Sequence, residues 1–477
     1  MMLLSNGCNF RAILLNESVS KFKAVAICLT LACALTIPAH ATTIIVSNIN
    51  DNGPGSLRQA LVDANDGDTI DATGISGTIT LTTGELLVDK SVTINAAGAD
   101  ELAVDGNATS RVFQVGSGET VTISGLTIRN GHDDTTGGGI DNESGATLTI
   151  TNSILSGNTA GSVDDPSVEG GGIFNSGTLT IVNSTVSANT AGGISGGGGG
   201  IFNGGTLAIV NSTVSGNTAI KGAGIDNGGA ATTVTITNST FSGNAASAYG
   251  GACFNVGTLE IANSTLSDNS AFIGGGILVF GPLQIGNTIL NRGDSGVNIT
   301  NFGTVTSLGY NLSSDDAGGF LTGPGDQINT DPLIGPLQNN GGPTFTHELL
   351  SGSPAINAGD PSFTPPPFFH QRGPGFDRVV NGRIDIGSFE VQTQTVAIHV
   401  EASGRKVGGI NTVRLTWSGA TSANIDVYRD GTVIATVPNT GTYTDSTGDT
   451  GRARYTYKVC EAGTSTCSNE VTVRFRH

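Results

Sequence analysis

Apolar and polar residues alternate over short stretches along most of the chain, a pattern that predicts β-strands. Between Ile140 and Asn291 these stretches recur in six similar copies: a glycine run, a short apolar step, Asn, Gly-Thr-Leu-x-Ile, Asn-Ser-Thr and Ser-Gly-Asn. The clearest copies span residues 170–191 and 198–219. A unit that repeats at a nearly fixed period indicates a solenoid. The Asn-Ser or Asn-Thr steps of the six copies lie at Asn152, Asn183, Asn211, Asn238, Asn263 and Asn287.

Each copy holds three short strand patterns, too few residues for a propeller blade and too much β-pattern for a helical repeat. We therefore predict one coil of a parallel β-helix per copy. The apolar positions of one coil should point inward and stack on those of the next, as Leu179, Ile181 and Val186 would on Leu207, Ile209 and Val214. Asn tolerates left-handed backbone, and stacked Asn amides can hydrogen-bond between coils, so we assign these Asn residues a structural role.

One helix is predicted, ahead of the repeats. Ser56 and Gln59 have the spacing of a capping box, and the apolar positions that follow fall on one helical face. Such a helix would plug the apolar end of the solenoid. The residues on that face are Leu57, Ala60, Leu61 and Ala64.

The repeat is lost after residue 292, and residues 346–390 are rich in loop-forming residues, including Pro365–Pro367. From Val396 a run of short strand patterns with a turn at Asp430-Gly431 predicts a β-sandwich. The expected domains are a signal peptide at 1–41, a β-helix with an N-terminal cap at 42–301, an irregular C-terminal cap at 302–392 and a sandwich at 396–477.

The N-terminus has the pattern of a secretory signal: a basic region, an apolar stretch at residues 24–37 that is too short to span a bilayer, and Ala39-His40-Ala41 as cleavage site. We therefore expect a secreted or cell-surface protein. In an exported chain the close pair Cys460 and Cys467 predicts a disulfide. Cys253 replaces the Ile of the repeat, so we expect it to be a buried apolar residue.

The chain has 477 residues, with 21 Lys and Arg against 39 Asp and Glu, and a formal net charge of −18. This balance excludes nucleic acid as an expected partner, because phosphate binding needs clustered Lys and Arg. We expect a monomer without a transmembrane segment.

One charged segment, Arg129 to Asp134, is a candidate catalytic site. Carboxylates of Asp133 and Asp134, with Asp164 and Asp165 in the equivalent loop of the next copy, could hold Ca²⁺ against a uronate, with Arg129 as base. Asp133 and Asp134 could instead serve a glycoside hydrolase, although aromatic residues for sugar stacking are sparse there. The simpler interpretation, which we prefer, is that these are solvated acidic turns. Lys221 is the only basic residue between Asn130 and Asn291, which disfavours an anionic substrate.

A second charged cluster lies after the repeats. We interpret it as ion pairs that pin the C-terminal cap onto the last coil of the β-helix. Its members are Arg372, Asp377, Arg378, Arg383 and Asp385.

The repeats resemble those of secreted bacterial right-handed parallel β-helix proteins of the pectin-lyase-like class, and Gly-Gly-Ala/Ile-Phe-x-Asn resembles the polymorphic outer-membrane protein repeat. Residues 302–390 resemble the choice-of-anchor domain that closes such β-helices, through motifs at 341–347, 352–360, 371–373 and 385–390. That family has Asp before Gln-Arg-Gly, where this chain has His370. Residues 396–477 resemble a bacterial fibronectin type III module. This resemblance implies that Trp417 is a core residue, that Tyr455 or Tyr457 is the corner tyrosine and that Cys460–Cys467 closes the last hairpin.

The expected function is that of a secreted or cell-surface non-enzymatic β-helix protein, used for adhesion or for contact with an extracellular glycan or surface protein. The alternatives are a polysaccharide-active enzyme, a Ca²⁺-dependent lyase before a glycoside hydrolase, and a structural surface or matrix component. No cofactor is expected apart from Ca²⁺ under the lyase hypothesis. The scaffold itself hosts unrelated functions, so the fold does not choose among them.

Overall fold

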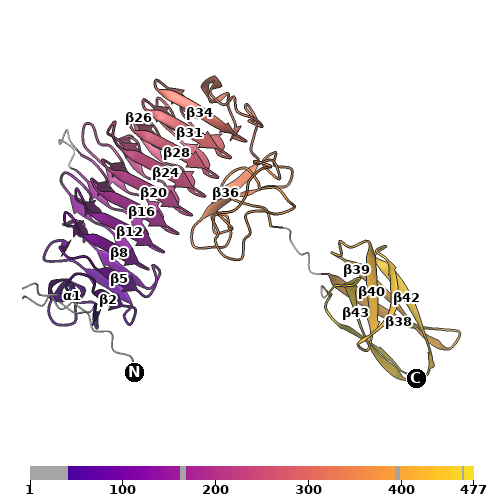
Figure 1. The fold of residues 1–477 in the computed structure, drawn as a ribbon. Coiled ribbons are helices and arrows are strands. Elements are labelled where there is room, and N and C mark those ends of the chain that lie inside the picture. Colours follow the sequence, from indigo (N-terminus) through magenta and orange to yellow (C-terminus); the bar gives the residue numbers. More distant parts are fainter. Residues whose placement is uncertain (1–40, 162–167, 393–397, 465–466, 477) are drawn as a thin grey trace, which may run out of the picture. The chain divides into compact units, whose positions relative to one another are not determined.

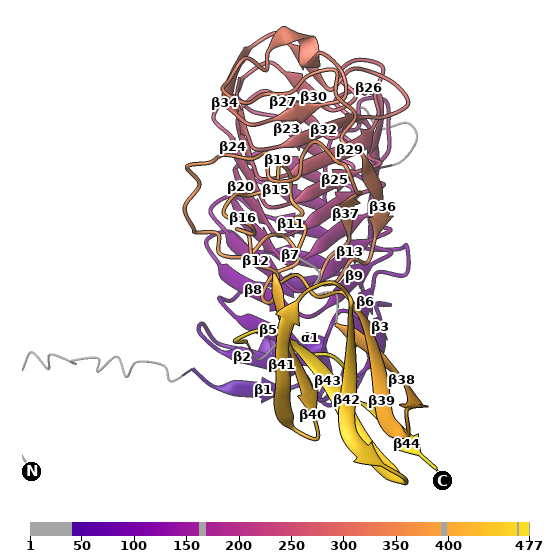
Figure 2. The same cartoon turned by 90° about the vertical axis from the view of Figure 1, so that its right-hand side faces the viewer.

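The computed structural model describes residues 41–161, 168–392, 398–464 and 467–476. The predicted signal peptide therefore lies outside the described residues, apart from Ala41. From β1 onward the chain winds into a parallel β-helix, in which each coil stacks on the one before it (Figures 1 and 2). The prediction of a parallel β-helix is confirmed.

Four parallel sheets run along the β-helix. Sheet 1 contains β1 (Thr43–Ile45), β2 (Thr69–Ala72), β5 (Thr93–Ala96), β8 (Thr120–Ser124), β12 (Thr147–Thr151), β16 (Thr178–Val182), β20 (Thr206–Val210), β24 (Thr233–Thr237), β28 (Thr258–Ala262), β31 (Pro282–Gly286) and β34 (Thr304–Gly309). Sheet 2 contains β3 (Gly77–Thr80), β6 (Leu102–Asp105), β9 (Thr127–Arg129), β13 (Ile154–Ser156), β17 (Thr185–Ser187), β21 (Thr213–Ser215), β25 (Thr240–Ser242), β29 (Thr265–Asn269), β32 (Ile289–Arg292) and β35 (Leu312–Ser313).

Sheet 3 contains β4 (Leu86–Val88), β7 (Phe113–Val115), β11 (Ile140–Asn142), β15 (Ile173–Asn175), β19 (Ile201–Asn203), β23 (Ile225–Asn227), β27 (Cys253–Asn255), β30 (Ile277–Val279) and β33 (Ile299–Asn301). Sheet 4 is shorter and contains β10 (His132–Asp133), β14 (Thr159–Ala160), β18 (Thr190–Ala191), β22 (Thr218–Lys221) and β26 (Ala245–Tyr249). Because sheet 4 is present, the middle coils have four strands where the sequence predicts three.

The interior of the β-helix consists of aliphatic side chains stacked in register. Leu179 pairs with Leu207 and Ile181 with Ile209, while Val186 pairs with Val214, and all six are buried as predicted. The period of two places Thr180 and Ala208, the residues between these aliphatic positions in the two strands, on the outside. Burying one such aliphatic side chain contributes roughly 1.5–3 kcal/mol, repeated at every coil. Cys253 occupies an Ile position in this core and is buried, also as predicted.

The Asn residues of the repeats have two structural roles, left-handed corners and amide ladders. The sequence predicts that one set of Asn residues fills both roles, but the structure divides them between different residues. The predicted corner set, from Asn152 to Asn287, adopts left-handed backbone with φ of 49–52° between sheets 1 and 2. The continuous amide ladders are made by other Asn residues, which are buried inside the corners. One ladder runs through Asn142, Asn175, Asn203, Asn227 and Asn255, and the other through Asn158, Asn189, Asn217, Asn244 and Asn269.

Helix α1 (Leu57–Asp63) closes the N-terminal end, with Leu57, Ala60 and Leu61 buried in the main core. Ser56 accepts a hydrogen bond from the Gln59 backbone N–H, as a capping residue does. The reciprocal half of the predicted capping box is wrong, because the Gln59 side chain donates to Asp63 and the Ser56 N–H donates to Gly53.

The coil at the C-terminal end continues beyond residue 301, the expected limit of the β-helix. Strands β34 and β35 extend sheets 1 and 2, so residues up to Ser313 still belong to the solenoid. The short 3₁₀ helix η1 (Ala317–Gly319) follows, and Ala317 and Leu321 join the main core. These few residues, rather than the whole segment 302–392, close the apolar core at this end.

The rest of that segment folds back along the outside of sheet 2. It begins with the antiparallel hairpin β36 (Ile334–Gln338) and β37 (Thr346–Leu349). Gln371 hydrogen-bonds to Thr213 and Thr240, and Ser388 to Thr265, three residues on three successive coils. The prediction that this segment is pinned only onto the last coil is wrong, because it covers the side of several coils.

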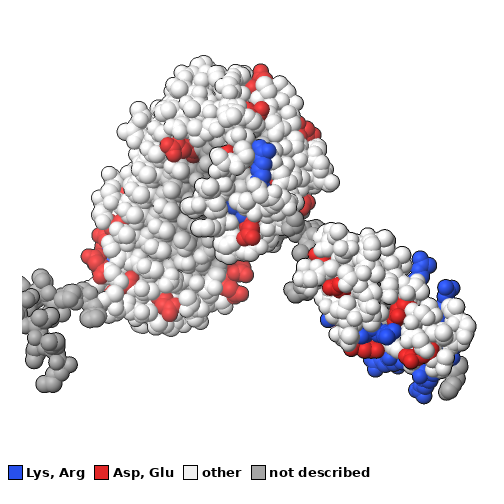
Figure 3. All heavy atoms as spheres, turned by 45° about the vertical axis from the view of Figure 1, so that its right-hand side comes forward, with Lys and Arg blue, Asp and Glu red and all other residues white. Residues whose placement is uncertain are grey.

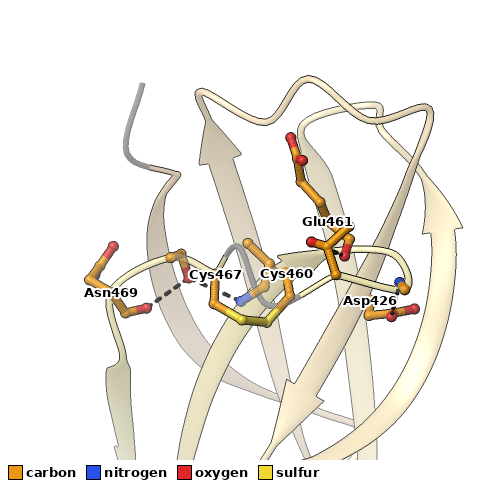
Figure 4. The surroundings of a disulfide bond; sticks show 9 residues. Asp426, Cys460, Glu461, Cys467 and Asn469 are labelled. Atoms are coloured by element: carbon orange, nitrogen blue, oxygen red, sulfur yellow. Dashed lines mark hydrogen bonds between the residues drawn. A yellow bond between two sulfur atoms is a disulfide. The ribbon is translucent and has the colours of Figure 1, made fainter. Parts of the chain in front are cut away.

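Residues 398–476 form a terminal module of two antiparallel sheets around one core. One sheet contains β38 (His399–Val407), β39 (Ile410–Ser418) and β42 (Thr442–Thr450); the other contains β41 (Thr432–Pro438), β40 (Asn424–Arg429), β43 (Ala453–Glu461) and β44 (Val471–Phe475). Trp417 and Tyr457 are buried in this core. Cys460 and Cys467 form the predicted disulfide, shown in Figure 4, and nearby the Ser468 hydroxyl accepts a hydrogen bond from the Val459 N–H.

Candidate functional site

The outer surface of sheet 3 carries two parallel rows of side chains, which we call the sheet-3 face. Row one is the middle residue of each strand, which points outward because its two neighbours point into the core. Row two lies five residues earlier in each coil, on the other side of the glycine run. Row one contains Asp141, Phe174, Phe202, Asp226, Phe254 and Leu278, and row two contains Thr136, Glu169, Gly197, Lys221, Tyr249 and Ile273.

Aromatic rings follow one another along this face. Phe174 and Phe202 stack with ring centroids 5.2 Å apart and planes 4° from parallel. Farther along, two more rings extend the face beyond row one: Phe280 directly follows β30 and Phe302 directly follows β33. Phe254 lies 5.6 Å from Phe280, and Phe280 lies 5.3 Å from Phe302. Phe280 is 47% exposed and Phe302 66% exposed. This second group, with Tyr249 beside Phe254, is an exposed aromatic patch at the C-terminal end of the face.

A buried ion pair lies between the two aromatic groups. The Lys221 ammonium is 3.0 Å from the Asp226 carboxylate, which is fully buried, and 5.7 Å from the centre of the Phe254 ring. The pair fits because position 197 is glycine: a Cβ there would meet the Asp226 carboxylate and the Lys221 side chain. Glu169 pairs with Gly197 from the preceding coil, so two carboxyl groups flank this space.

Burial shifts the titration of these acids. Burial raises the pKa of Asp226 to about 6, although the positive charge of Lys221 lowers it. The pKa of Glu169 is also raised by burial and lowered by Lys221. Oδ1 of Asp226 is buried without a hydrogen-bond partner among the described residues. An unpartnered buried carboxylate oxygen carries a desolvation cost, which favours the protonated acid.

The N-terminal end of the same face is organised by Arg111. Its guanidinium lies 2.8 Å from Glu85, 3.1 Å from Asp133 and 3.9 Å from Asp141. It also donates to the carbonyls of Thr136 and Gly137. Burial raises the pKa of Asp141 to about 6 despite the nearby Arg111. Arg111 therefore ties three coils together.

The residues proposed from the sequence for catalysis do not gather around one point. Arg129 pairs with Asp105 at 3.0 Å and lines a different hollow from Asp133 and Asp134. Asp133 pairs with Arg111, and Asp134 lies 3.4 Å from the His132 ring. Asp164 and Asp165 lie outside the described residues. Within the described ranges, no group of three or more His, Cys, Asp or Glu side chains is arranged to hold a metal.

Both carboxylate oxygens of Asp133 already interact with other groups of the protein. Its Oδ1 accepts hydrogen bonds from the backbone N–H groups of Thr135 and Thr136, and its Oδ2 pairs with Arg111. Burial raises the pKa of Asp133, but these hydrogen bonds and the Arg111 charge outweigh it and hold the pKa below its usual value. A calcium ion bound there would have to replace the Arg111 contact.

The second predicted cluster braces the segment that covers sheet 2, but mostly through backbone carbonyls rather than ion pairs. Arg383 donates to the carbonyls of Ala358 and Gly359. Arg372 lies between the rings of Phe376 and Phe389, about 4 Å from each centre. Arg378, fully buried, has one carboxylate contact, with Glu390 at 4.0 Å. Asp385 accepts from the backbone N–H groups of Asn357 and Val391, and Asp377 offers its carbonyl to Gln392. The ion-pair interpretation is therefore largely wrong.

Sequence reasoning passed over the sheet-3 face, although its signal is present in the repeat. The residue between the apolar step and Asn varies from copy to copy, and so does the residue five positions earlier. In the clearest copies these positions carry Glu169 with Phe174 and Gly197 with Phe202, and in the next copy Lys221 with Asp226. A residue that varies at an outward position of an otherwise regular coil is free of the packing constraint, and is therefore available for function.

A comparison with protein families supports this architecture. Residues 111–282 match the family described as the right handed beta helix region. No curated protein and no solved structure matches the chain. The chain is therefore a β-helix repeat protein, and its sheet-3 face lies almost entirely within the matched region. No helix in the described ranges is long and apolar enough to cross a bilayer.

Proposed function

We propose that this chain is an exported, surface-acting β-helix protein that binds a neutral glycan along the sheet-3 face without cleaving it. The observation that carries the proposal is the exposed aromatic patch formed by Tyr249, Phe254, Phe280 and Phe302. Three of these rings, Tyr249, Phe280 and Phe302, are exposed, and a contiguous exposed apolar patch of this kind marks a binding surface.

The chemistry of the patch suits a sugar. Each aromatic ring offers a flat apolar surface that packs against the C–H face of a pyranose, and aromatic side chains supply most of the energy of such contacts. Phe280 and Phe302 lie on adjacent coils, about 4.8 Å apart along the β-helix. A chain of sugars laid along the coils could therefore contact successive rings.

The charges on the face favour a neutral glycan over a polyuronate. The Lys221 ammonium lies 5.7 Å from the centre of the Phe254 ring in the aromatic patch, and it is paired with Asp226. Glu169 adds a second carboxyl group close by. An anionic polymer would meet more negative than positive charge here, whereas sugar hydroxyls could donate to the half-buried Glu169 carboxylate.

Two features support export. The residues before Ala41 have the pattern of a secretory signal, and the terminal module contains the Cys460–Cys467 disulfide. Disulfides persist in oxidising compartments outside the cytosol. Extracellular glycans are then the accessible class of ligand.

A second candidate function is cleavage of a polysaccharide at the same face. The specific observation in its favour is Asp226, whose raised pKa of about 6 is typical of a general acid, next to Lys221 and Glu169. Against it, the Asp226 side chain is fully buried, so a substrate would reach it only if Lys221 moved.

The test is a glycan array probed with the full mature chain and with a Phe280→Ala, Phe302→Ala variant. We expect the wild type to bind neutral polysaccharides and the variant to lose at least about tenfold in affinity, as truncation of two aromatic anchors does. A Phe345→Ala, Phe368→Ala variant removes two exposed rings from elsewhere and should bind normally. Equal binding by all three proteins would refute the proposal, and release of reducing sugar that Asp226→Asn abolishes would favour the enzyme.

A further inference from the structure

The terminal module carries a group of arginines that the sheet-3 face does not explain. Arg452 lies just before β43 and Arg454 is the second residue of that strand, while Arg474 lies in β44 and Arg476 directly follows it. Ala453 pairs with Phe475, which is buried, so the arginines on either side of this pair point to the opposite, outer surface. The four side chains and the two residues between them line one hollow of about 850 Å³.

The positions of these arginines destabilise the terminal module when nothing is bound to it. Arg454 lies directly opposite Arg474 across the two antiparallel strands. Like charges at directly opposed positions repel each other and destabilise a sheet. In the part of the chain that the structure describes, none of the four arginines forms an ion pair or a side-chain hydrogen bond with another residue. Two acidic residues near these strands already have partners within the module: Asp449, three residues before Arg452, accepts from the Tyr455 hydroxyl, and Asp430 accepts from the Thr456 backbone N–H.

The same patch is exceptional in the charge distribution of the chain. Residues 42–397 contain nine Lys and Arg against 31 Asp and Glu, whereas residues 398–477 contain nine against seven. Figure 3 shows Lys and Arg side chains at several places on the terminal module, and few on the visible face of the rest of the described chain. Almost half of the basic residues of the module line the one hollow.

We propose that this arginine patch binds an anionic polysaccharide, through the carboxylate or sulfate groups of successive sugars. Guanidinium groups recognise such planar or multi-oxygen anions with paired hydrogen bonds. Two arginines on each strand are about 7 Å apart along the strand, and the two strands are about 5 Å apart. A small anion would contact two of the four arginines, while an extended polymer that crosses both strands would contact all four.

Nucleic acid fits the patch less well. Proteins that bind single strands combine positive charge with exposed aromatic side chains on which bases stack. The aromatic residue within the patch, Phe475, points into the core and is buried. The terminal module thus holds an anionic polymer, while the sheet-3 face, which is independent of it, holds a neutral one.

The test is retention of the full mature chain on immobilised dextran sulfate, polygalacturonate and neutral dextran, with an Arg454→Gln, Arg474→Gln variant. We expect binding to at least one charged polymer, weakened by salt, with at least a tenfold loss in the variant. Binding to one of the two charged polymers alone identifies sulfate or carboxylate as the recognised group. An Arg405→Gln, Lys406→Gln variant removes the same charge from exposed positions on β38 and should bind within twofold of wild type.

Two further measurements on the Arg454→Gln, Arg474→Gln variant distinguish a loss of polymer binding from a loss of folding. Because the variant relieves a repulsion, the thermal unfolding of its module should not occur at a lower temperature than in wild type. Neutral glycan binding by the sheet-3 face should be unchanged in it, so the two proposals fail separately. Equal losses in both double variants, no binding of either charged polymer, or equally tight binding of single-stranded DNA would overturn the inference.

Discussion

The Lys221 ammonium lies 3.0 Å from the Asp226 carboxylate, in the space that a side chain at position 197 would fill. The two residues belong to one coil, but the room for their contact comes from the glycine of the coil before it. The centre of the sheet-3 face therefore depends on Gly197.

Gly197→Ala should displace this ion pair. A Cβ at position 197 would clash with Oδ2 of Asp226, so the carboxylate must move. We expect a loss of about 1–3 kcal/mol in the free energy of unfolding, the usual cost of overpacking, and weaker glycan binding. Gly192→Ala is the matched control, because a Cβ there would meet its nearest neighbours at 3.5 Å, an ordinary contact. Denaturant unfolding measures both variants, and equal stability of the two would contradict the packing described here.

The ion pair also predicts a pH dependence of stability. The pKa of Asp226 is about 6 in the folded chain and 3.8 in its unperturbed state, so between these values the folded state holds a proton that the unfolded state has released. The resulting stabilisation is fully present below pH 3.8 and is lost as the pH rises through 6. Its upper limit is about 3 kcal/mol.

Asp226→Asn removes this contribution. The melting temperature of the β-helix should therefore fall less between pH 4 and pH 7 in the variant than in wild type. Asp141, whose pKa is also raised to about 6, provides a comparison, since Asp141→Asn should flatten the same profile independently. Parallel profiles for wild type and the Asp226 variant would show that the buried acid does not titrate in this range.

Two kinds of Asn should respond differently to substitution. Asn189 donates to the Leu155 carbonyl and to Asn217, and accepts from the N–H and side chain of Asn158. Asn189→Ala leaves several buried groups unpaired, so we expect a loss of at least about 2 kcal/mol. Asn183, at φ 49°, has a backbone role, and Asn183→Ala should cost about 1 kcal/mol.

Substitution by glycine distinguishes the corner role of Asn183 from the ladder role of Asn189. Asn183→Gly should be close to neutral, because glycine adopts left-handed backbone without strain, whereas Asn189→Gly should be at least as harmful as Asn189→Ala. Thermal unfolding of the four variants provides the comparison. Similar losses at both positions would mean that the corner and ladder roles are not separate.

Calcium should not stabilise this chain through Asp133. The Arg111 guanidinium holds Oδ2 of Asp133, and backbone N–H groups hold Oδ1, so a cation would have to displace a buried arginine. Melting temperatures in millimolar Ca²⁺ and in EDTA should agree. A rise with Ca²⁺ that Asp133→Asn abolishes would restore the calcium site that the acidic loop first indicated.

Much of the fold could be predicted from local pattern. Leu179 and Leu207 occur at the same place in neighbouring copies, so their stacking follows from the repeat alone. The Cys460–Cys467 bridge follows from close spacing in an exported chain. The covering of sheet 2 could not be predicted, because Gln371 contacts Thr213 across 158 residues and neither residue shows a pattern that marks the other.

The sheet-3 face was missed for a related reason. Regular positions attract attention in a repeat, yet they are the ones the stack itself requires. Lys221, Asp226 and Phe254 lie where the copies differ, and their proximity depends on the register of coils, which becomes known only with the fold. Asp133 was conspicuous because several charges adjoin it in the sequence, but its partner Arg111 comes from the preceding coil.

The most direct test of glycan binding at the sheet-3 face is hydroxyl-radical footprinting of the full mature chain, with and without a neutral polysaccharide. Bound sugar should protect Tyr249, Phe280 and Phe302, whose rings are exposed in the free protein, and leave Phe345 and Phe368 labelled as before. Protection confined to Phe345, Phe368 or the terminal module, with the aromatic patch still fully labelled, would contradict the account.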